Sequence, residues 1–199
     1  MNQTYMKEKK IFPLVMSMAL PMMLSMAFNS LYNIVDSYFV AKLSEDAMTA
    51  LSLVYPAQNL LTAVAVGFGV GVNAMISFYL GAQNQEKADK TATQGIVLGV
   101  LHGVLLMLLF LCGMNWFLGM FTKSDAVRAL GMEYSNVVFL FSVIVTGGIT
   151  LEKIFQAVGR MRATMVSMIA GFVTNIVLDP LLIFGIGPLS LIHISEPTR

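Results

Sequence analysis

The sequence predicts an all-α membrane protein with five transmembrane helices. Hydrophobic residues make up 57 % of the 199 positions and charged residues only 12 %, about half of the ~25 % usual in a soluble domain. Mean hydropathy is +0.76. Five stretches with few or no charges approach or exceed the ~20 residues that a helix needs to cross the hydrocarbon core. Each is expected to be helical because lipid offers backbone groups no hydrogen-bond partner.

The first two spans come from long charge-free runs. The first, residues 12–43, follows from a run over residues 11–35. At ~1.5 Å per residue it is about 48 Å long, so it must tilt, bend at Pro21 or protrude from the bilayer. The second span, residues 47–80, lies within the next charge-free run, residues 47–85.

Three further spans complete the prediction. We place the third at residues 91–119, within the charge-free run of residues 91–122, and the fourth at residues 132–154, around the charge-free run of residues 134–151. The fifth, residues 163–187, is charge-free as far as residue 178 and continues past Asp179. A charge in an otherwise apolar helix is costly, so this residue becomes a candidate functional group.

The distribution of basic residues orients the chain, because Lys and Arg are enriched in cytoplasmic segments. With the tail of residues 1–11 inside, the inner segments hold Lys7, Lys9, Lys10, Lys87, Lys90, Lys153, Arg160 and Arg162. The outer segments hold only Lys42, Lys123 and Arg128. We therefore expect a multi-pass protein with a cytoplasmic N-terminus. The formal charge of +1 offers no basic field for nucleic acid.

Residues 189–199, LSLIHISEPTR, differ in composition from the membrane-like chain before them. They resemble an in-frame translation of a transposase sequencing adapter, so we expect them to be an artefact and exclude them from the fold. The alternative is a genuine short tail. On the artefact interpretation, the natural protein continues beyond about Pro188 and this chain is a fragment.

The first span carries one polar stripe. Ser25, Asn29, Asn33 and Asp36 are spaced by four, four and three residues, which places them on one helix face. Such a stripe is expected to face a protein interior or water, and Asp36 falls in the outer half of the span. The alternative is an interfacial Asp at a helix end.

The fifth span carries a second polar group around Asp179. Asn175 and Asp179 are four residues apart on one face, and Pro180 cannot donate to the carbonyl of Ile176. A carboxylate, a carboxamide and a freed carbonyl in one turn are suited to a small cation or a proton, and Thr174 adds a hydroxyl. The alternative is a proline-induced helix end in the outer headgroups.

The two acids are expected at compatible depths. Two carboxylates that share a low-dielectric cavity cannot easily both ionise, so such a pair can hold a proton or exchange it for Na⁺. Metalloprotease, P-loop and nucleophile-elbow motifs are missing from the sequence, and Cys112 is the lone cysteine. We expect no enzyme activity, no cofactor, and no metal beyond Na⁺ at Asp36, Asn175 and Asp179.

Four segments in order carry a family resemblance. They are Leu20-Pro21 with residues 31–40 (LYNIVDSYFV), residues 67–84 with Gly67-x-x-x-Gly71 and GAQN, residues 156–160 (QAVGR), and residues 175–185 (NIVLDPLLIFG). Together they resemble the multidrug and toxic compound extrusion (MATE) transporters over about residues 12–187.

The resemblance implies a twelve-helix transporter of two six-helix lobes, of which this chain holds five helices of the N-terminal lobe. It implies alternating access that exports amphipathic, often cationic drugs across a bacterial-type plasma membrane against inward H⁺ or Na⁺. Asp36, Asn175 and Asp179 match the family's cation site, and Tyr134 is a weaker match. Asn29, Asn33, Pro21, Pro180 and Thr174 are candidates for cavity or gating roles. The sixth helix and second lobe are absent, so we expect the fragment alone to be inactive.

Two other functions stay open. A related flippase for lipid-linked oligosaccharides should carry more cationic residues in its cavity to hold pyrophosphate. An integral-membrane enzyme or assembly subunit should show a nucleophile or metal cluster in the missing half.

Overall fold

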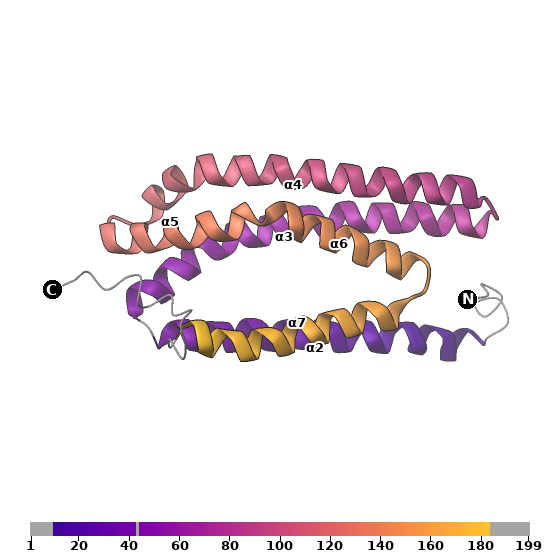
Figure 1. The fold of residues 1–199 in the computed structure, drawn as a ribbon, viewed down its shortest axis with the longest axis horizontal. Coiled ribbons are helices and arrows are strands. Elements are labelled where there is room, and N and C mark those ends of the chain that lie inside the picture. The colour runs from indigo at the N-terminus through magenta and orange to yellow at the C-terminus, as the bar shows by residue number, and fades with distance from the viewer. Residues whose placement is uncertain (1–9, 43, 184–199) are drawn as a thin grey trace. The chain divides into compact units, whose positions relative to one another are not determined.

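The computed structural model describes residues 10–42 and 44–183, and the described part of the chain is helical apart from turns and short links (Figure 1). Within that part, some residues are described by their backbone alone, without their side chains. They are Ser25, Asn29, Tyr32, Asp36, Phe39, Val40, Asn175 and residues 178–183. The tail of residues 1–9 and residues 184–199 lie outside it, which includes the adapter-like segment.

Six helices follow one another along the chain. They are α2 (Ile11–Ala41), α3 (Glu45–Gly81), α4 (Gln85–Phe121), α5 (Asp125–Leu140), α6 (Ser142–Ala157) and α7 (Met161–Ile183). By length and composition, α3, α4 and residues 11–35 of α2 could each cross a membrane. The pair α5–α6, bent by 47°, is long and apolar enough for a fourth span when the two helices are taken as one broken span. Residues 161–174 of α7 form a shorter apolar helix.

The fourth predicted span differs from the structure because it is broken. Phe141 separates α5 from α6 and leaves the helical backbone conformation, with φ −88° and ψ 6°. The side chains on either side of it, Phe139 and Ser142, are both fully buried. Packing therefore holds both halves in place while the axis turns between them.

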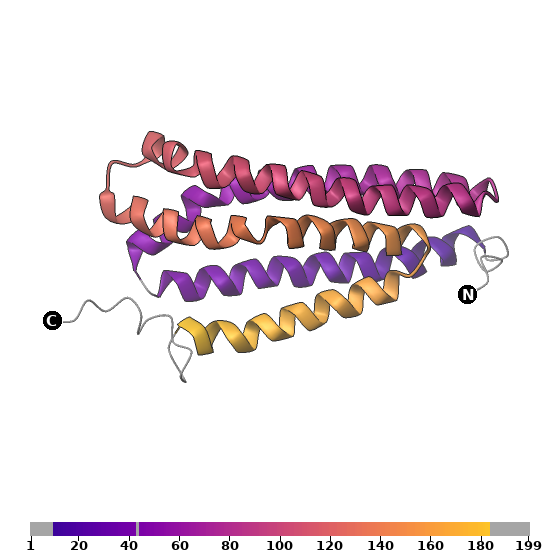
Figure 2. The ribbon, with the colours of Figure 1, turned by 45° about the horizontal axis from the view of Figure 1, so that its top comes forward.

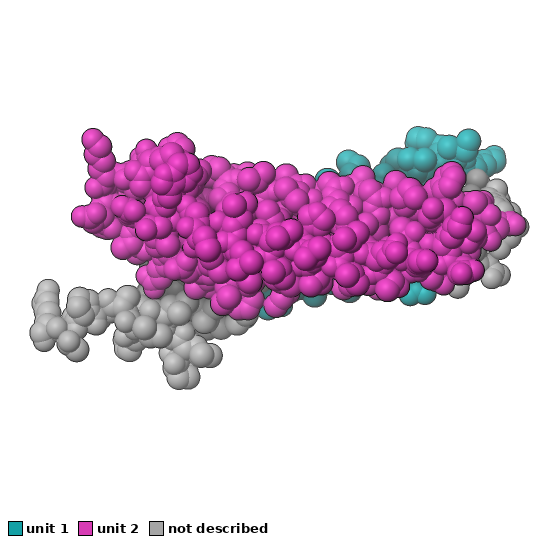
Figure 3. Space-filling view, turned by 90° about the horizontal axis from the view of Figure 1, so that it is seen from above, with its two compact units in different colours: residues 1–39, 159–199 teal, residues 40–158 magenta. Residues whose placement is uncertain are grey.

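The chain divides into two compact units (Figure 3). Unit 1 comprises residues 1–39 and 159–199, with α2 and α7. Unit 2 comprises residues 40–158, with α3 to α6, and here α3, α4 and α6 all contact one another (Figure 2).

Turn residues set the ends of the unit 2 helices. Ser44 caps α3 by accepting a hydrogen bond from the Ala47 amide at 3.0 Å, and Asn84 caps α4 by accepting from the Lys87 amide at 3.0 Å. Gln83, with φ 58°, makes the tight turn between these helices. Such caps satisfy backbone donors that a helix start leaves free.

Two apolar clusters form the core of unit 2. The larger contains Phe110 of α4 and Phe139 of α5, whose rings stack with centroids 4.4 Å apart. The smaller is built on Val72, Ile76 and Ala88 near the α3–α4 turn. The aromatic stack ties the long helix α4 to the first half of the broken pair.

Candidate functional site

The predicted cation-site residues of unit 1 lie on two helices. The backbone of Asp36 lies in α2, and the backbones of Asn175 and Asp179 lie in α7. The structure does not describe the side chains of these three residues. The helix α7 continues through Pro180 to Ile183, so the proline does not end it.

One aromatic contact relates positions along these two helices. The rings of Phe28 in α2 and Phe172 in α7 lie with centroids 5.3 Å apart. Both helices run in the same direction in Figures 1 and 2. Asp36 follows Phe28 by about 12 Å of helix axis, and Asp179 follows Phe172 by about 10 Å. The two acidic positions therefore stand at nearly the same level of the pair.

The remaining candidates of unit 1 are spread along both helices. Pro21 lies inside α2 and is partly buried, Asn33 is exposed, and Thr174 of α7 is exposed. The side chain of Asn29 lies outside those described. Among the described side chains, no three His, Cys, Asp or Glu residues come close enough to hold a metal ion.

Tyr134 lies in unit 2, on α5. Its ring packs against the larger apolar cluster, and its hydroxyl accepts a hydrogen bond from Gln58 Nε2 of α3 at 3.0 Å. Tyr134 is therefore a partly buried link between α3 and α5.

A polar network at one end of α6 was not anticipated from the sequence. Asn73 Nδ2 of α3 donates to the backbone oxygen of Lys153 at 2.8 Å. Lys153 Nζ lies 3.4 Å from Glu152 Oε1 and donates to Gln156 Oε1 at 3.2 Å, while Gln156 Nε2 donates to Glu152 Oε1 at 2.6 Å. Gly69 makes room for the Lys153 side chain. The signal was available, because three polar residues within one turn of an apolar span need partners.

A buried polar row on α5 and α6 was also missed. Ser135, Ser142, Thr146 and Thr150 are each at most 1 % exposed. Thr150 and Thr146 face Gly99 and Gly103 of α4, where a side chain would not fit. Small residues at intervals of four allow such close helix packing in membranes.

Replacing Tyr134 by Phe tests its link to Gln58. We expect a stability loss of about 0.5–1 kcal/mol, since interhelical hydrogen bonds in membranes contribute modestly. In a double-mutant cycle, Gln58→Leu should cost much less in the Tyr134→Phe background than in the parent. Thermal unfolding of purified protein measures this, and strictly additive effects would contradict the link.

Acidic positions at one level of two apolar helices are typical of membrane transport proteins. The MatE family model matches residues 21–181. The chain belongs to the MatE family, and it corresponds to an N-terminal portion of such a transporter.

Curated relatives and solved structures agree with this assignment. The chain is 31 % identical over 182 residues to the multidrug export protein MepA of Staphylococcus aureus, and 30 % identical over 183 residues to MepA of Staphylococcus haemolyticus. The alignments cover 91–92 % of this chain but only 40 % of each relative.

Among solved structures, a MOP superfamily transporter from Pyrococcus furiosus matches with a TM-score of 0.83 and 27 % identity, over 88 % of this chain and 39 % of that one. A MATE structure in complex with MaD3S matches with a TM-score of 0.83 and 30 % identity, over 87 % and 39 %. The chain thus spans about two fifths of the transporters that it matches.

Proposed function

We propose that this chain is the N-terminal lobe of a cation-coupled multidrug exporter whose second lobe lies in the rest of a longer protein. Family membership and the multidrug export relatives support export of amphipathic, often cationic compounds. The observation that supports the coupling proposal is that Asp36 and Asp179 lie at similar distances along the parallel helices α2 and α7 from the Phe28–Phe172 ring contact.

The mechanism rests on differential binding of the ion. From outside, H⁺ or Na⁺ neutralises Asp36 and Asp179, with Asn175 as a further oxygen ligand, and the family resemblance adds Tyr134 to the ion-binding residues. Neutralisation removes the cost of bringing two carboxylates together, which stabilises a conformation in which α2 bends near Pro21. That conformation binds drug less tightly, so drug is released outward.

Drug binding to the inward-facing state then favours release of the ion to the cytoplasm, because coupling between two ligands is reciprocal. Asn29, Asn33 and Thr174 contribute polar groups along the pathway. In this proposal the N-terminus is cytoplasmic and the protein resides in a bacterial-type plasma membrane. It carries out transport without enzyme chemistry.

The test uses the longer protein, reconstituted in vesicles with an imposed H⁺ or Na⁺ gradient and a fluorescent lipophilic cation. We expect dye movement against its own gradient that stops when the driving ion gradient is collapsed by an ionophore. Vesicles that hold only the 199-residue chain are the control and should show no coupled flux. Dye movement equal to that of protein-free vesicles under both gradients would refute the proposal.

A further inference from the structure

The end of unit 2 where α4 meets α5 holds a fixed positive charge. Arg128 Nε donates to Asn115 Oδ1 at 3.0 Å, and its Nη2 donates to the Asn115 backbone oxygen at 3.2 Å. A side-chain carbon added at Gly119 would lie 3.5 Å from Arg128 Cζ. The guanidinium is therefore held against the backbone of α4 by two neutral acceptors.

The start of α5 determines this placement. Ser124 caps the helix by accepting a hydrogen bond from the Val127 amide at 3.4 Å, and Thr122 Oγ1 accepts from the Ser124 amide at 3.1 Å. The Val127 side chain is buried, with 4 % exposure. The cap and this buried anchor fix the first turn, and Arg128 follows directly toward α4.

In the described part of the chain, the ion pair found is Lys153–Glu152. No described carboxylate lies within ion-pair distance of Arg128. Asp125 and Glu133, the acids nearest along α5, are exposed. Asn115 engages two of the five N–H donors that a guanidinium carries. The site thus offers a full positive charge and three further donors to a partner.

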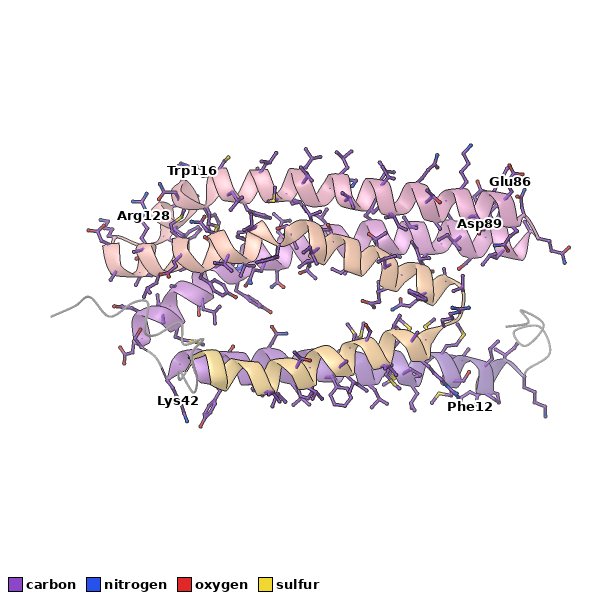
Figure 4. The ribbon with its side chains drawn as sticks, in the orientation of Figure 1. Phe12, Lys42, Glu86, Asp89, Trp116 and Arg128 are labelled. Atoms are coloured by element: carbon purple, nitrogen blue, oxygen red, sulfur yellow. The ribbon has the colours of Figure 1, made fainter. Side chains whose placement is uncertain are left out.

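The surroundings of this charge are apolar and open. Trp116, adjacent to Asn115 in the chain, is 71 % exposed, and Met120 and Phe121 are more than half exposed. Figure 4 shows Trp116 and Arg128 at the same end of unit 2. An exposed Trp beside a basic residue at the end of an apolar helix is typical of the membrane–water interface.

We propose that Arg128, Asn115 and Trp116 bind the headgroup phosphate of an anionic phospholipid. The guanidinium suits phosphate oxygens in charge and geometry, and the acyl chains would follow the exposed apolar side of α4, which includes Leu105 and Leu109. A zwitterionic headgroup brings its own cation, so the site favours a lipid with net negative charge. This inference needs only membrane insertion and is independent of the transport mechanism.

Trp116 is the single tryptophan of the sequence, so its fluorescence reports the site directly. The experiment places the chain in phosphatidylcholine vesicles with a minor fraction of phosphatidylglycerol, and one lipid at a time carries bromine on its acyl chains as a quencher. We expect brominated phosphatidylglycerol to be enriched about fivefold near Trp116 over its bulk fraction. Equal quenching per molecule by both lipids would overturn the proposal. Absence of quenching by either lipid would also do so, because protein would then cover Trp116.

Three variants separate a built site from diffuse attraction. Arg128→Gln should abolish the enrichment, and Asn115→Ala should reduce it although the charge remains. Lys123→Gln, the matched control at a neighbouring exposed cation, should leave it nearly unchanged. Equal losses in the Arg128 and Lys123 variants would overturn the proposal.

Arg128→Lys guards against a variant that does not fold, with helix content checked by circular dichroism. It keeps the charge but loses the two-point attachment to Asn115. Enrichment should fall clearly below the parent. Enrichment that is unchanged in both Arg128→Lys and Asn115→Ala would contradict a positioned guanidinium.

Discussion

Replacing Asp36 and Asp179 together by Asn should lower ion-driven drug export by the longer protein about tenfold or more. Typical coupling free energies between two ligands produce changes of this size. Asn preserves side-chain volume and one oxygen but cannot lose or gain the charge on which ion binding depends. Because the two acids are proposed to act as one unit, each single replacement should be nearly as damaging as the pair. Ion-driven dye efflux from vesicles measures all three variants.

The matched control is Glu133→Gln, which removes an exposed acid from α5 and should leave export unchanged. Membrane abundance of every variant must equal that of the parent. Export that survives both Asp36→Asn and Asp179→Asn at the parental rate would exclude these acids from coupling. Losses that simply multiply would show that the acids act separately.

The helices of this protein could be predicted from where charges interrupt the apolar sequence. Predicted spans such as residues 47–80 and 91–119 fall within α3 and α4 as observed. The GAQN segment that carried part of the family resemblance has a structural task, since Gln83 makes the turn and Asn84 caps α4. Local chemistry determines such features, so a single sequence contains them.

The break at Phe141 could not be predicted in the same way. The glycine pair Gly147–Gly148 lies in the same predicted span, but the axis does not break there, and a side-chain carbon at either would meet no atom within 4 Å. The axis instead turns between the buried Phe139 and Ser142. Contacts with α3 and α4 decide this position, and the sequence of α5–α6 alone does not contain them.

The candidate site residues could be proposed from the sequence, but their arrangement in space could not. Spacing alone places Asp36 on a polar stripe and Asp179 beside Asn175. Their common level depends on α2 pairing with α7 through Phe28 and Phe172, which is a tertiary contact between distant segments. For the same reason the link between Tyr134 and Gln58 was not foreseen.

Gly103→Ala should destabilise the protein, whereas Gly113→Ala on the same helix should not. Both changes remove the entropic cost of a helical glycine, worth about 0.5–1 kcal/mol in favour of Ala. A side-chain carbon at Gly103 would lie 2.8 Å from Val143 Cα and closer still to Thr146 Oγ1, whereas at Gly113 it meets nothing within 4 Å. Overpacking typically costs about 1–3 kcal/mol, so the two effects should differ in sign.

Gly99→Ala supplies the intermediate case, because all three of its closest neighbours are side-chain atoms of Thr150. A side chain can rotate, whereas the Val143 backbone can move only if α6 shifts away from α4. We therefore expect unfolding temperatures in the order Gly113→Ala, Gly99→Ala, Gly103→Ala, from highest to lowest, in detergent-purified protein. If Gly103→Ala matched Gly113→Ala, α4 and α6 would not approach as closely as the structure has them. Gly99 and Gly103 of α4 would then serve a purpose other than close packing against α6.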